Sequence, residues 1–202
     1  MTILEPSGNL SYSPENITLT RGVAMSNLHP TYSGGVVENW SIHPALPAGL
    51  NFSNGVLSGT SSINMTTTMF TVYANNSGGS AAATINITVL EPAVDLLYSP
   101  DNLTLMRGTT MAPLHPTVSG GNVSEWGIEP ALPSGLNFAD GVFSGTPDVN
   151  MTQTQFTVYA NTSGGSAMAW VNITVLEPAV NLSYDPYNLT LTRNVSMTPL
   201  SP

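Results

Sequence analysis

The amino-acid sequence predicts an all-β protein built from tandem β-sandwich repeats of 86 residues. The chain repeats itself: Glu5-Pro6 recurs as Glu91-Pro92 and as Glu177-Pro178, and 56 of the 86 aligned positions of the two copies are identical, without an insertion. Within each copy, apolar and polar residues alternate over short segments, which is the period of a half-buried strand. No segment has the period of an amphipathic helix.

The end of each copy predicts a β-hairpin. In Ser80–Leu90, mostly apolar residues at odd positions alternate with mostly polar ones, and Thr68–Asn75 places Phe, Val and Ala at even positions. Asn76–Gly79 between them contains two glycines, which adopt positive φ angles at little cost. We therefore expect two antiparallel strands joined by a tight loop, with Asn75 and Asn86 facing outward.

Short strands upstream complete the predicted sandwich. Asn54-Gly55 is a strong signal for a type I′ turn between two of them. Trp40 and its counterpart Trp126 are predicted to lie in the core. The other strands predicted in the first copy are Leu10–Tyr12, Ile17–Thr20, Val36–Ile42, Leu50–Phe52 and Val56–Ser58. About seven short strands separated by turn signals indicate an immunoglobulin-like β-sandwich.

Four segments of each copy resemble a known family. They are Leu46–Phe52, Gly55–Thr60, Phe70–Asn75 and Ser77–Ala81, repeated as Leu132–Phe138, Gly141–Thr146, Phe156–Asn161 and Ser163–Ala167. These segments are similar to the putative Ig-like repeat (He_PIG type) of prokaryotic and archaeal surface proteins. The resemblance implies an extracellular Ig-like module, usually found in arrays within large adhesins or envelope proteins, and implies no catalytic residue. The segments also resemble dystroglycan-type cadherin repeats, which can bind calcium between domains, but the paired acidic motifs of such sites are missing.

The repeat divides the chain into four parts. Residues 1–6 match the end of a preceding repeat, 7–92 form the first Ig-like repeat, 93–178 form the second, and 179–202 match the opening strands of a third. This overhang fits an excerpt of a longer array, and it also fits a complete subunit whose orphan end segment donates a strand to a neighbour. The connection through Pro92 contains no flexible Gly/Ser stretch, so neighbouring domains are expected to stack as a semi-rigid rod.

The composition excludes several classes of function. Charged residues make up 7% of the chain, the net charge is −9, and the chain has three arginines, no lysine and no cysteine. The basic footprint of a nucleic-acid-binding protein is therefore absent, and no run of about 18 apolar residues predicts membrane insertion. The three histidines, His29, His43 and His115, suggest neither a catalytic group nor a metal cluster. We predict no enzymatic activity and no cofactor.

The densest motif is the N-glycosylation sequon, Asn-X-Ser/Thr, which occurs fifteen times. Such a frequency predicts a glycoprotein, because bulky sugars would supply the hydration and shielding that the missing charges do not. The alternative is that Asn and Thr serve only as turn and strand-surface residues. The fifteen asparagines are Asn9, Asn16, Asn39, Asn51, Asn64, Asn75, Asn86, Asn102, Asn122, Asn150, Asn161, Asn172, Asn181, Asn188 and Asn194.

Two further features suggest contacts. Each copy keeps one arginine and one glutamate in register, and we predict that inter-repeat ion pairs among Arg21, Arg107, Glu91 and Glu177 fix the angle between domains. The alternative is a solvated pair that contributes little to stability. Trp170 replaces the Thr84 of the first copy on the outward side of the last strand. It is a candidate contact for a partner chain or sugar ring, together with Tyr32, although packing against a neighbouring side chain or glycan stem would also explain it.

These features together predict a structural role on the outside of a cell. We expect an N-glycosylated segment of a filament, stalk or envelope array, whose partners are its own glycans and other copies of itself, arranged head to tail or joined by a donated strand. Heavy sequon use without lysine or cysteine suggests an archaeal envelope. The alternative is an adhesin or carbohydrate-binding surface module.

Overall fold

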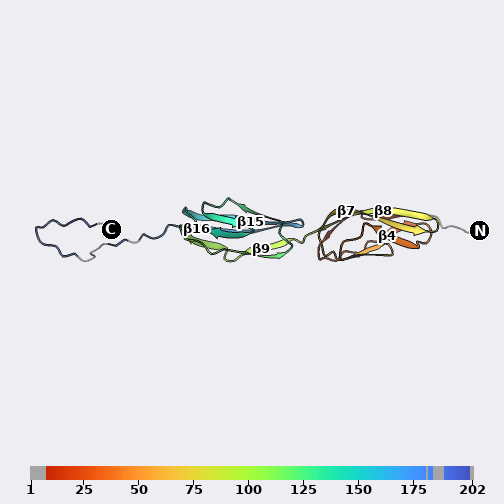
Figure 1. The fold of residues 1–202 in the computed structure, drawn as a ribbon, viewed down its shortest axis with the longest axis horizontal. Helices are drawn as coiled ribbons and strands as arrows, with labels where there is room; N and C mark the ends of the chain where they lie inside the picture. Colours follow the sequence, from red (N-terminus) through yellow and green to blue (C-terminus); the bar gives the residue numbers. More distant parts are fainter. Residues whose placement is uncertain (1–7, 181, 184–188, 201–202) are drawn as a thin grey trace, which may run out of the picture.

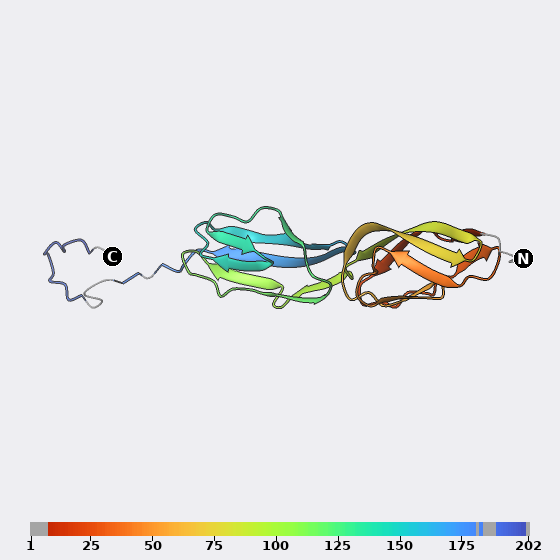
Figure 2. The same cartoon turned by 45° about the vertical axis from the view of Figure 1, so that its right-hand side comes forward.

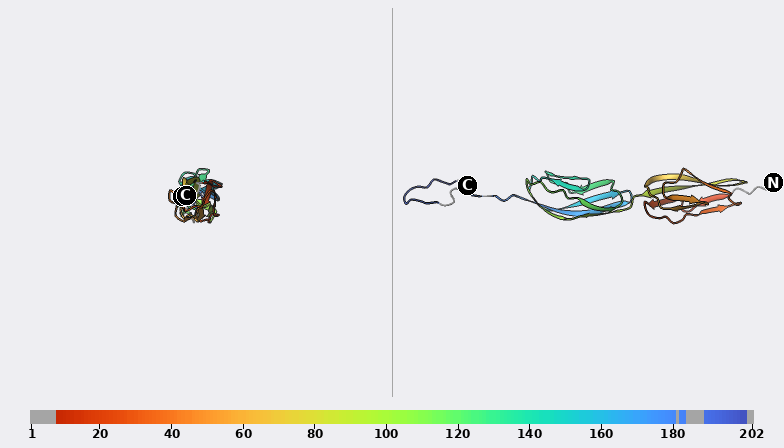
Figure 3. Two further views of the ribbon diagram at one scale, coloured as in Figure 1. Left: turned by 90° about the vertical axis from the view of Figure 1, so that its right-hand side faces the viewer. Right: turned by 60° about the horizontal axis from the view of Figure 1, so that its bottom comes forward.

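The computed structural model describes residues 8–180, 182–183 and 189–200. Each repeat forms a β-sandwich of eight strands, and the two sandwiches lie end to end along the longest axis (Figure 1). Viewed along that axis, one sandwich lies behind the other (Figure 3). The first repeat contains β1 (Asn9–Tyr12), β2 (Asn16–Thr20), β3 (Pro30–Ser33), β4 (Asn39–His43), β5 (Leu50–Ser53), β6 (Val56–Gly59), β7 (Met65–Asn76) and β8 (Gly79–Leu90). The second contains β9 (Val94–Tyr98), β10 (Asn102–Met106), β11 (Pro116–Gly120), β12 (Glu125–Glu129), β13 (Leu136–Ala139), β14 (Val142–Gly145), β15 (Met151–Thr162) and β16 (Gly165–Leu176).

The same sheets recur in both repeats. In the first, a four-stranded sheet has the order β2-β8-β7-β4, in which β2 runs parallel to β8 and the other neighbours are antiparallel. The pairs β1-β3 and β5-β6 are separate two-stranded sheets. The second repeat has the corresponding order β10-β16-β15-β12, with the pairs β9-β11 and β13-β14. The predicted all-β, tandem Ig-like fold is confirmed.

The core of each domain lies along the two long strands of its four-stranded sheet. On β7 and β8 the inward side chains, among them Phe70, Val72, Ile85 and Ile87, are at most 1% exposed. Their strand neighbours carry the polar and threonine side chains outward, as the alternation predicts. Burying each large apolar side chain contributes about 1.5–3 kcal/mol, so this hairpin contributes strongly to the stability of the domain.

A buried tyrosine ties the β5-β6 turn to the core. Asn54 and Gly55 both have positive φ, 51° and 79°, as a type I′ turn requires. The hydroxyl of Tyr12 donates a hydrogen bond of 2.6 Å to the carbonyl of Gly55. The ring of Trp40 covers the same glycine so closely that an added Cβ would lie 2.9 Å from it. Trp40 and Trp126 thus pack at the margin of their cores and stay half-buried.

Removing the equivalent tyrosine hydroxyl of the second domain is expected to reduce the stability of that domain. Tyr98 donates to the carbonyl of Gly141 in the equivalent turn. Tyr98→Phe leaves that carbonyl without its partner, so the free energy of unfolding of this domain should fall by about 1–3 kcal/mol in denaturant titrations. Tyr159→Phe is the matched control, because among the described residues the Tyr159 hydroxyl makes no hydrogen bond, and it should change little. Equal effects of the two substitutions would contradict this role.

The two buried tyrosines, Tyr12 and Tyr98, predict that the stability of both domains decreases at alkaline pH. Burial raises the pKa of Tyr12 from 10.0 to about 12, and it raises the pKa of Tyr98 as well. Because the pKa of the hydroxyl is higher in the folded state, the stabilisation that the protonated tyrosine gives is complete below its ordinary pKa of 10.0. This stabilisation is lost as the pH rises through the pKa of the folded state.

Two features of the topology differ from the expectation. The strand β3 is not among the predicted strands; Pro30 begins this short strand, which pairs with β1. Proline is tolerated at the first residue of a strand. The described residues within 179–200 form no strand. In the first repeat the equivalent strands β1 and β2 pair with β3 and β8.

Candidate functional site: the inter-domain junction and the outer sheet faces

The junction between the domains is built around Glu91, which follows directly after β8. Figure 2 shows the short, extended connection from one sandwich to the next. Arg21 follows directly after β2, and the parallel pairing of β2 with β8 brings it beside the end of β8, where its N–H donates to the carbonyl of Leu90 (2.8 Å). Its guanidinium pairs with the Glu91 carboxylate through Nη2 (2.8 Å) and Nε (3.2 Å).

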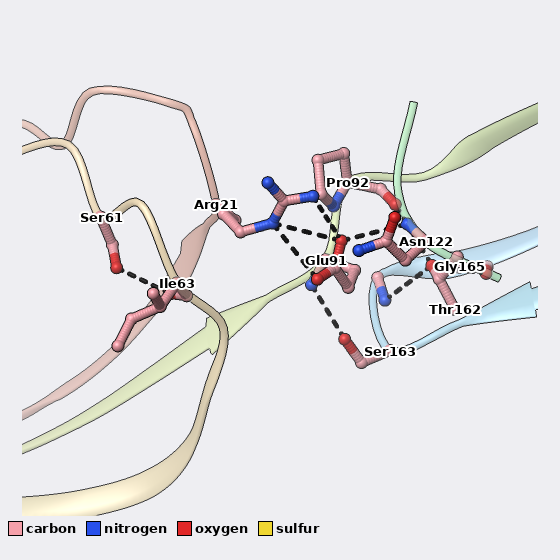
Figure 4. Close-up of polar contacts among 10 residues, drawn as sticks. Arg21, Ser61, Ile63, Glu91, Pro92, Asn122, Thr162, Ser163 and Gly165 are labelled. Carbon is pink, nitrogen blue, oxygen red and sulfur yellow. Dashed lines mark hydrogen bonds and ion pairs between the residues drawn. The ribbon is translucent and has the colours of Figure 1, made fainter. Parts of the chain in front are cut away.

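Loops of the second domain close over the same glutamate (Figure 4). The backbone N–H of Asn122 donates to Oε2 of Glu91 (3.2 Å), and the backbone N–H of Glu91 donates to Oγ of Ser163 (2.9 Å). The hydroxyl of Thr162 donates to the carbonyl of Pro92 (3.2 Å). Glu91 therefore accepts hydrogen bonds from both domains and leaves only 8% of its side chain exposed.

The fit of these loops depends on glycine. A Cβ on Gly164 would lie 1.8 Å from the carbonyl oxygen of Glu91, and one on Gly121 would lie 2.2 Å from that of Pro92. Neither position can accept a side chain without separating the domains. The backbones of the linker and of the second domain are therefore in direct contact.

The electrostatics of Glu91 follow from these partners. The hydrogen bond from Arg21, and after it the backbone hydrogen bond from Asn122, hold the pKa of the Glu91 carboxyl below its usual 4.5, although desolvation opposes the shift. The same pair raises the pKa of Arg21. Glu91 is thus kept ionised at neutral pH inside the junction.

The second ion pair shows what the following domain contributes. Arg107 and Glu177 are also paired, at the corresponding place after β10 and β16. Their side chains, however, are 43% and 49% exposed, against 30% and 8% for Arg21 and Glu91. Among the described residues, no loop covers Glu177 as Asn122 and Ser163 cover Glu91. The burial of Glu91 therefore comes from the neighbouring domain and not from the ion pair itself.

The sequon asparagines lie on the surface wherever the structure describes them. Nine of the thirteen described ones are exposed, and Asn75, Asn86, Asn161 and Asn172 are half-buried. Asn181 and Asn188 lie outside the described residues. Every described sequon asparagine is thus at least partly accessible to solvent.

Many of the sequons form pairs on adjacent strands, which the sequence did not reveal. Asn16 lies opposite Asn86, Asn102 opposite Asn172, and Asn39 opposite Asn75. Neighbouring strands are only about 5 Å apart, so sugars on both members of a pair would collide near their attachment points.

Hydrogen bonding distinguishes the members of two pairs. Nδ2 of Asn86 donates to Oδ1 of Asn16 (2.9 Å), and Nδ2 of Asn102 donates to Oδ1 of Asp101 (2.9 Å). Across the described part of the chain, Nδ2 of Asn16 and of Asn172 makes no such bond. An N-linked sugar is attached to Nδ2. Asn16 and Asn172 are therefore the members of these pairs whose Nδ2 is more available for glycosylation.

The outer sheet face of the second domain carries an exposed apolar strip. Trp170 on β16 is 55% exposed, and Met168 on the same face of the strand is 56% exposed. The equivalent residues on β8 are Thr84 and Ala82, so the strip belongs to the second domain alone. Tyr32 differs: it packs against the core and contacts the Trp40 ring edge-on at 6.2 Å.

Among the residues described, no three His, Asp or Glu side chains are grouped so that they could hold a metal ion. No helix long and apolar enough to cross a membrane occurs in the described part of the chain.

Comparison with known proteins agrees with the fold. The model of the family described as Putative Ig domain matches residues 6–90 and 95–176. A structure of the four N-terminal Ig domains of Dscam1 isoform 9.44 is similar, with a TM-score of 0.52 and 12% identity over 84% of this chain and 46% of that one. The corresponding structure of isoform 6.44 gives a TM-score of 0.48, 12% identity and the same coverage. A structure of titin domains Z1Z2 in complex with telethonin gives a TM-score of 0.41 and 16% identity, over 89% of this chain and 100% of that one.

These identities are low enough that the similarity shows the fold alone. The chain spans about half the length, 46%, of the Dscam1 structures that it matches. No curated protein matches the chain.

Proposed function

The chain belongs to the Putative Ig domain family, and from this premise we propose that it is a structural, N-glycosylated segment of an extracellular filament, stalk or cell-envelope array built from stacked Ig-like domains. The observation that carries the proposal is the closed junction, in which Glu91 accepts hydrogen bonds from Arg21 of one domain and Asn122 of the next. A junction that orders successive domains is what a spacer requires. The segment has no catalytic part in this proposal.

The surface supports a place outside the cell. Charged residues are only 7% of the chain, and outward residues include Met69, Leu97, Met168 and Trp170, each more than half exposed. A surface with so few charges needs another source of hydration, and sugars on exposed asparagines would supply it. This combination favours a heavily glycosylated surface protein, of the kind expected in an archaeal envelope.

The partners that we propose are other copies of the same module, arranged head to tail. The half-exposed pair Arg107–Glu177 repeats the chemistry of Arg21–Glu91, without a loop over it in the described part of the chain. A further repeat, in the same polypeptide or in a neighbouring one, would cover Glu177 as the second domain covers Glu91.

Glycopeptide mass spectrometry of protein from its native source tests the glycosylation. We expect sugars on exposed sequons and, because of the strand spacing, about one sugar for each cross-strand pair. The hydrogen bond on Nδ2 is expected to decide two pairs, with Asn16 occupied in preference to Asn86, and Asn172 in preference to Asn102 although Asn102 is the more exposed of the two. In the third pair exposure decides, and Asn39 should be occupied in preference to the half-buried Asn75. Asn51, which lies opposite Ser58, is the unpaired control and should be occupied independently. Unmodified asparagines throughout would refute the glycoprotein role, and frequent double occupancy would refute the pairing rule.

A second candidate function is that of an adhesin or carbohydrate-binding module. It is favoured by one observation, the exposure of Trp170 and Met168 on the second domain only. Loss of binding to cells or to a glycan array on Trp170→Ala would support it over a purely structural role.

A further inference from the structure

We propose that Trp170 is a stacking platform for the first sugar of an N-glycan on Asn172, so that the second domain holds this glycan flat against its outer sheet. The inference rests on the proposed N-glycosylation and adds a specific site to it. It concerns one face of β16, where the aromatic residue, the acceptor asparagine and the sequon threonine follow one another.

The first argument is the geometry of the strand. Trp170, Asn172 and Thr174 occupy alternate positions of β16, so their side chains leave the same face, with neighbouring ones about 7 Å apart. The inward residues between them, Val171 and Ile173, are fully buried, which fixes this orientation. A sugar attached to Asn172 would therefore begin beside the indole ring.

The second argument is the exposure of the indole. The strand β10 begins at Asn102, which lies opposite Asn172, and the preceding Asp101 accepts the N–H of Asn172 through its carbonyl (2.7 Å), so the strand β10 does not itself extend beside Trp170. On its other side Trp170 faces Thr157 of β15, a small side chain. The indole consequently remains 55% exposed.

The third argument is chemical. The face of an indole ring carries partial negative charge, and the C–H groups on one face of a pyranose ring carry partial positive charge, so the two surfaces attract as they exclude water. Asn172 is also the member of its pair with the freer Nδ2, because Asn102 donates to Asp101. The indole and the asparagine whose Nδ2 makes no hydrogen bond among the described residues therefore occur on the same strand.

The first repeat supplies a built-in comparison. At the equivalent positions Thr84 precedes Asn86, and Nδ2 of Asn86 is engaged with Asn16. A sugar there would have no aromatic ring to contact. The two repeats thus present the same sequon with and without the platform.

The test is a double-mutant cycle on the glycosylated protein. Trp170→Thr, Asn172→Gln and the double variant are produced in a host that glycosylates the chain, with occupancy at Asn172 measured by mass spectrometry. We expect the sugar at Asn172 to lower the unfolding equilibrium constant of the second domain. In Trp170→Thr protein the sugar should lower this constant by a factor about two- to tenfold smaller than in the unsubstituted protein. Asn172→Gln should also increase acrylamide quenching of indole fluorescence, because the sugar no longer shields Trp170.

Two controls make the result specific, both made with Asn16→Ala so that Asn86 is the remaining sequon of its pair and its Nδ2 is no longer engaged. In this background Asn86→Gln should show no coupling to Thr84→Ala, and Thr84→Trp should create coupling to a sugar on Asn86. Glycosylation at Asn172 with no coupling to Trp170 would overturn this inference and leave the proposed glycoprotein role intact. An unmodified Asn172 among other occupied sequons would also overturn the inference, whereas unmodified asparagines everywhere would overturn both. Self-association that is lost on Trp170→Thr would assign the strip to a second copy of the chain and refute the sugar contact.

Discussion

Replacing Glu91 with glutamine is expected to release the two domains from their fixed arrangement. The substitution keeps the size of the side chain but removes the charge that binds Arg21 and strengthens the hydrogen bond from Asn122. We expect the backbone amide of Asn122 to exchange with solvent about tenfold faster or more, because its hydrogen bond is weakened and the junction opens more often. Small-angle X-ray scattering should at the same time change from the profile of a rod to that of two jointed bodies.

The chain contains a matched control for this experiment. Glu177→Gln removes the same ion-pair chemistry at a half-exposed site, so it should leave both the exchange of Asn122 and the scattering profile unchanged. If Glu91→Gln and Glu177→Gln behaved alike, the ordering of the domains would not depend on the Glu91 junction.

The junction should also respond to acid. Because the folded-state pKa of Glu91 is lower than its ordinary 4.5, the stabilisation from the ionised carboxylate is complete above about pH 4.5 and is lost as the pH falls through the folded value. Inter-domain order should therefore decrease at lower pH, and Glu91→Gln should remove this step.

Protein that lacks sugars is expected to aggregate. Its surface would then present exposed apolar side chains with only 7% charged residues in the chain to keep molecules apart. Each edge strand of the first four-stranded sheet, β2 and β4, carries a sequon, at Asn16 and Asn39. Without sugars these edges have little protection against pairing with another chain.

We expect the soluble concentration, measured by light scattering, to fall by roughly an order of magnitude for protein made in a host without N-glycosylation. Asn16→Gln and Asn39→Gln together should reproduce part of this loss in glycosylated protein. Asn51→Gln, on the short β5-β6 hairpin, serves as the control and should have a smaller effect. Equal solubility of the sugar-free and glycosylated proteins would show that the sequons do not protect the surface.

The sequence predicted the long hairpin well because its signals are local. Ser80–Leu90 and Thr68–Asn75 are included in β8 and β7, and Asn54-Gly55 forms the predicted turn, since alternation and turn residues are visible within a few positions. The strand β3 has four residues, of which the first is proline, and its pairing with β1 spans about twenty positions. Such a strand leaves no local signal.

For the functional surfaces, the sequence predicted which residues take part but not the contacts between them. The register of Arg21 and Glu91 suggested an ion pair, but the contact of Glu91 with the second domain uses the backbone N–H of Asn122, which any residue could supply. The cross-strand pairing of Asn16 with Asn86 arises from a parallel strand pair 70 residues apart. The first contact does not depend on side-chain identity, and the second depends on the register of two distant strands, so both required the three-dimensional structure.

Electron cryo-microscopy of the native material, at a resolution that shows side chains, tests the central claim most directly. The account predicts stacked domains with density continuous through Pro92, Glu91 in contact with the backbone of Asn122, and branched sugar density on sequons such as Asn16, Asn51 and Asn172. Domains at variable angles with unmodified asparagines would contradict the proposal of a stiff, glycan-coated spacer.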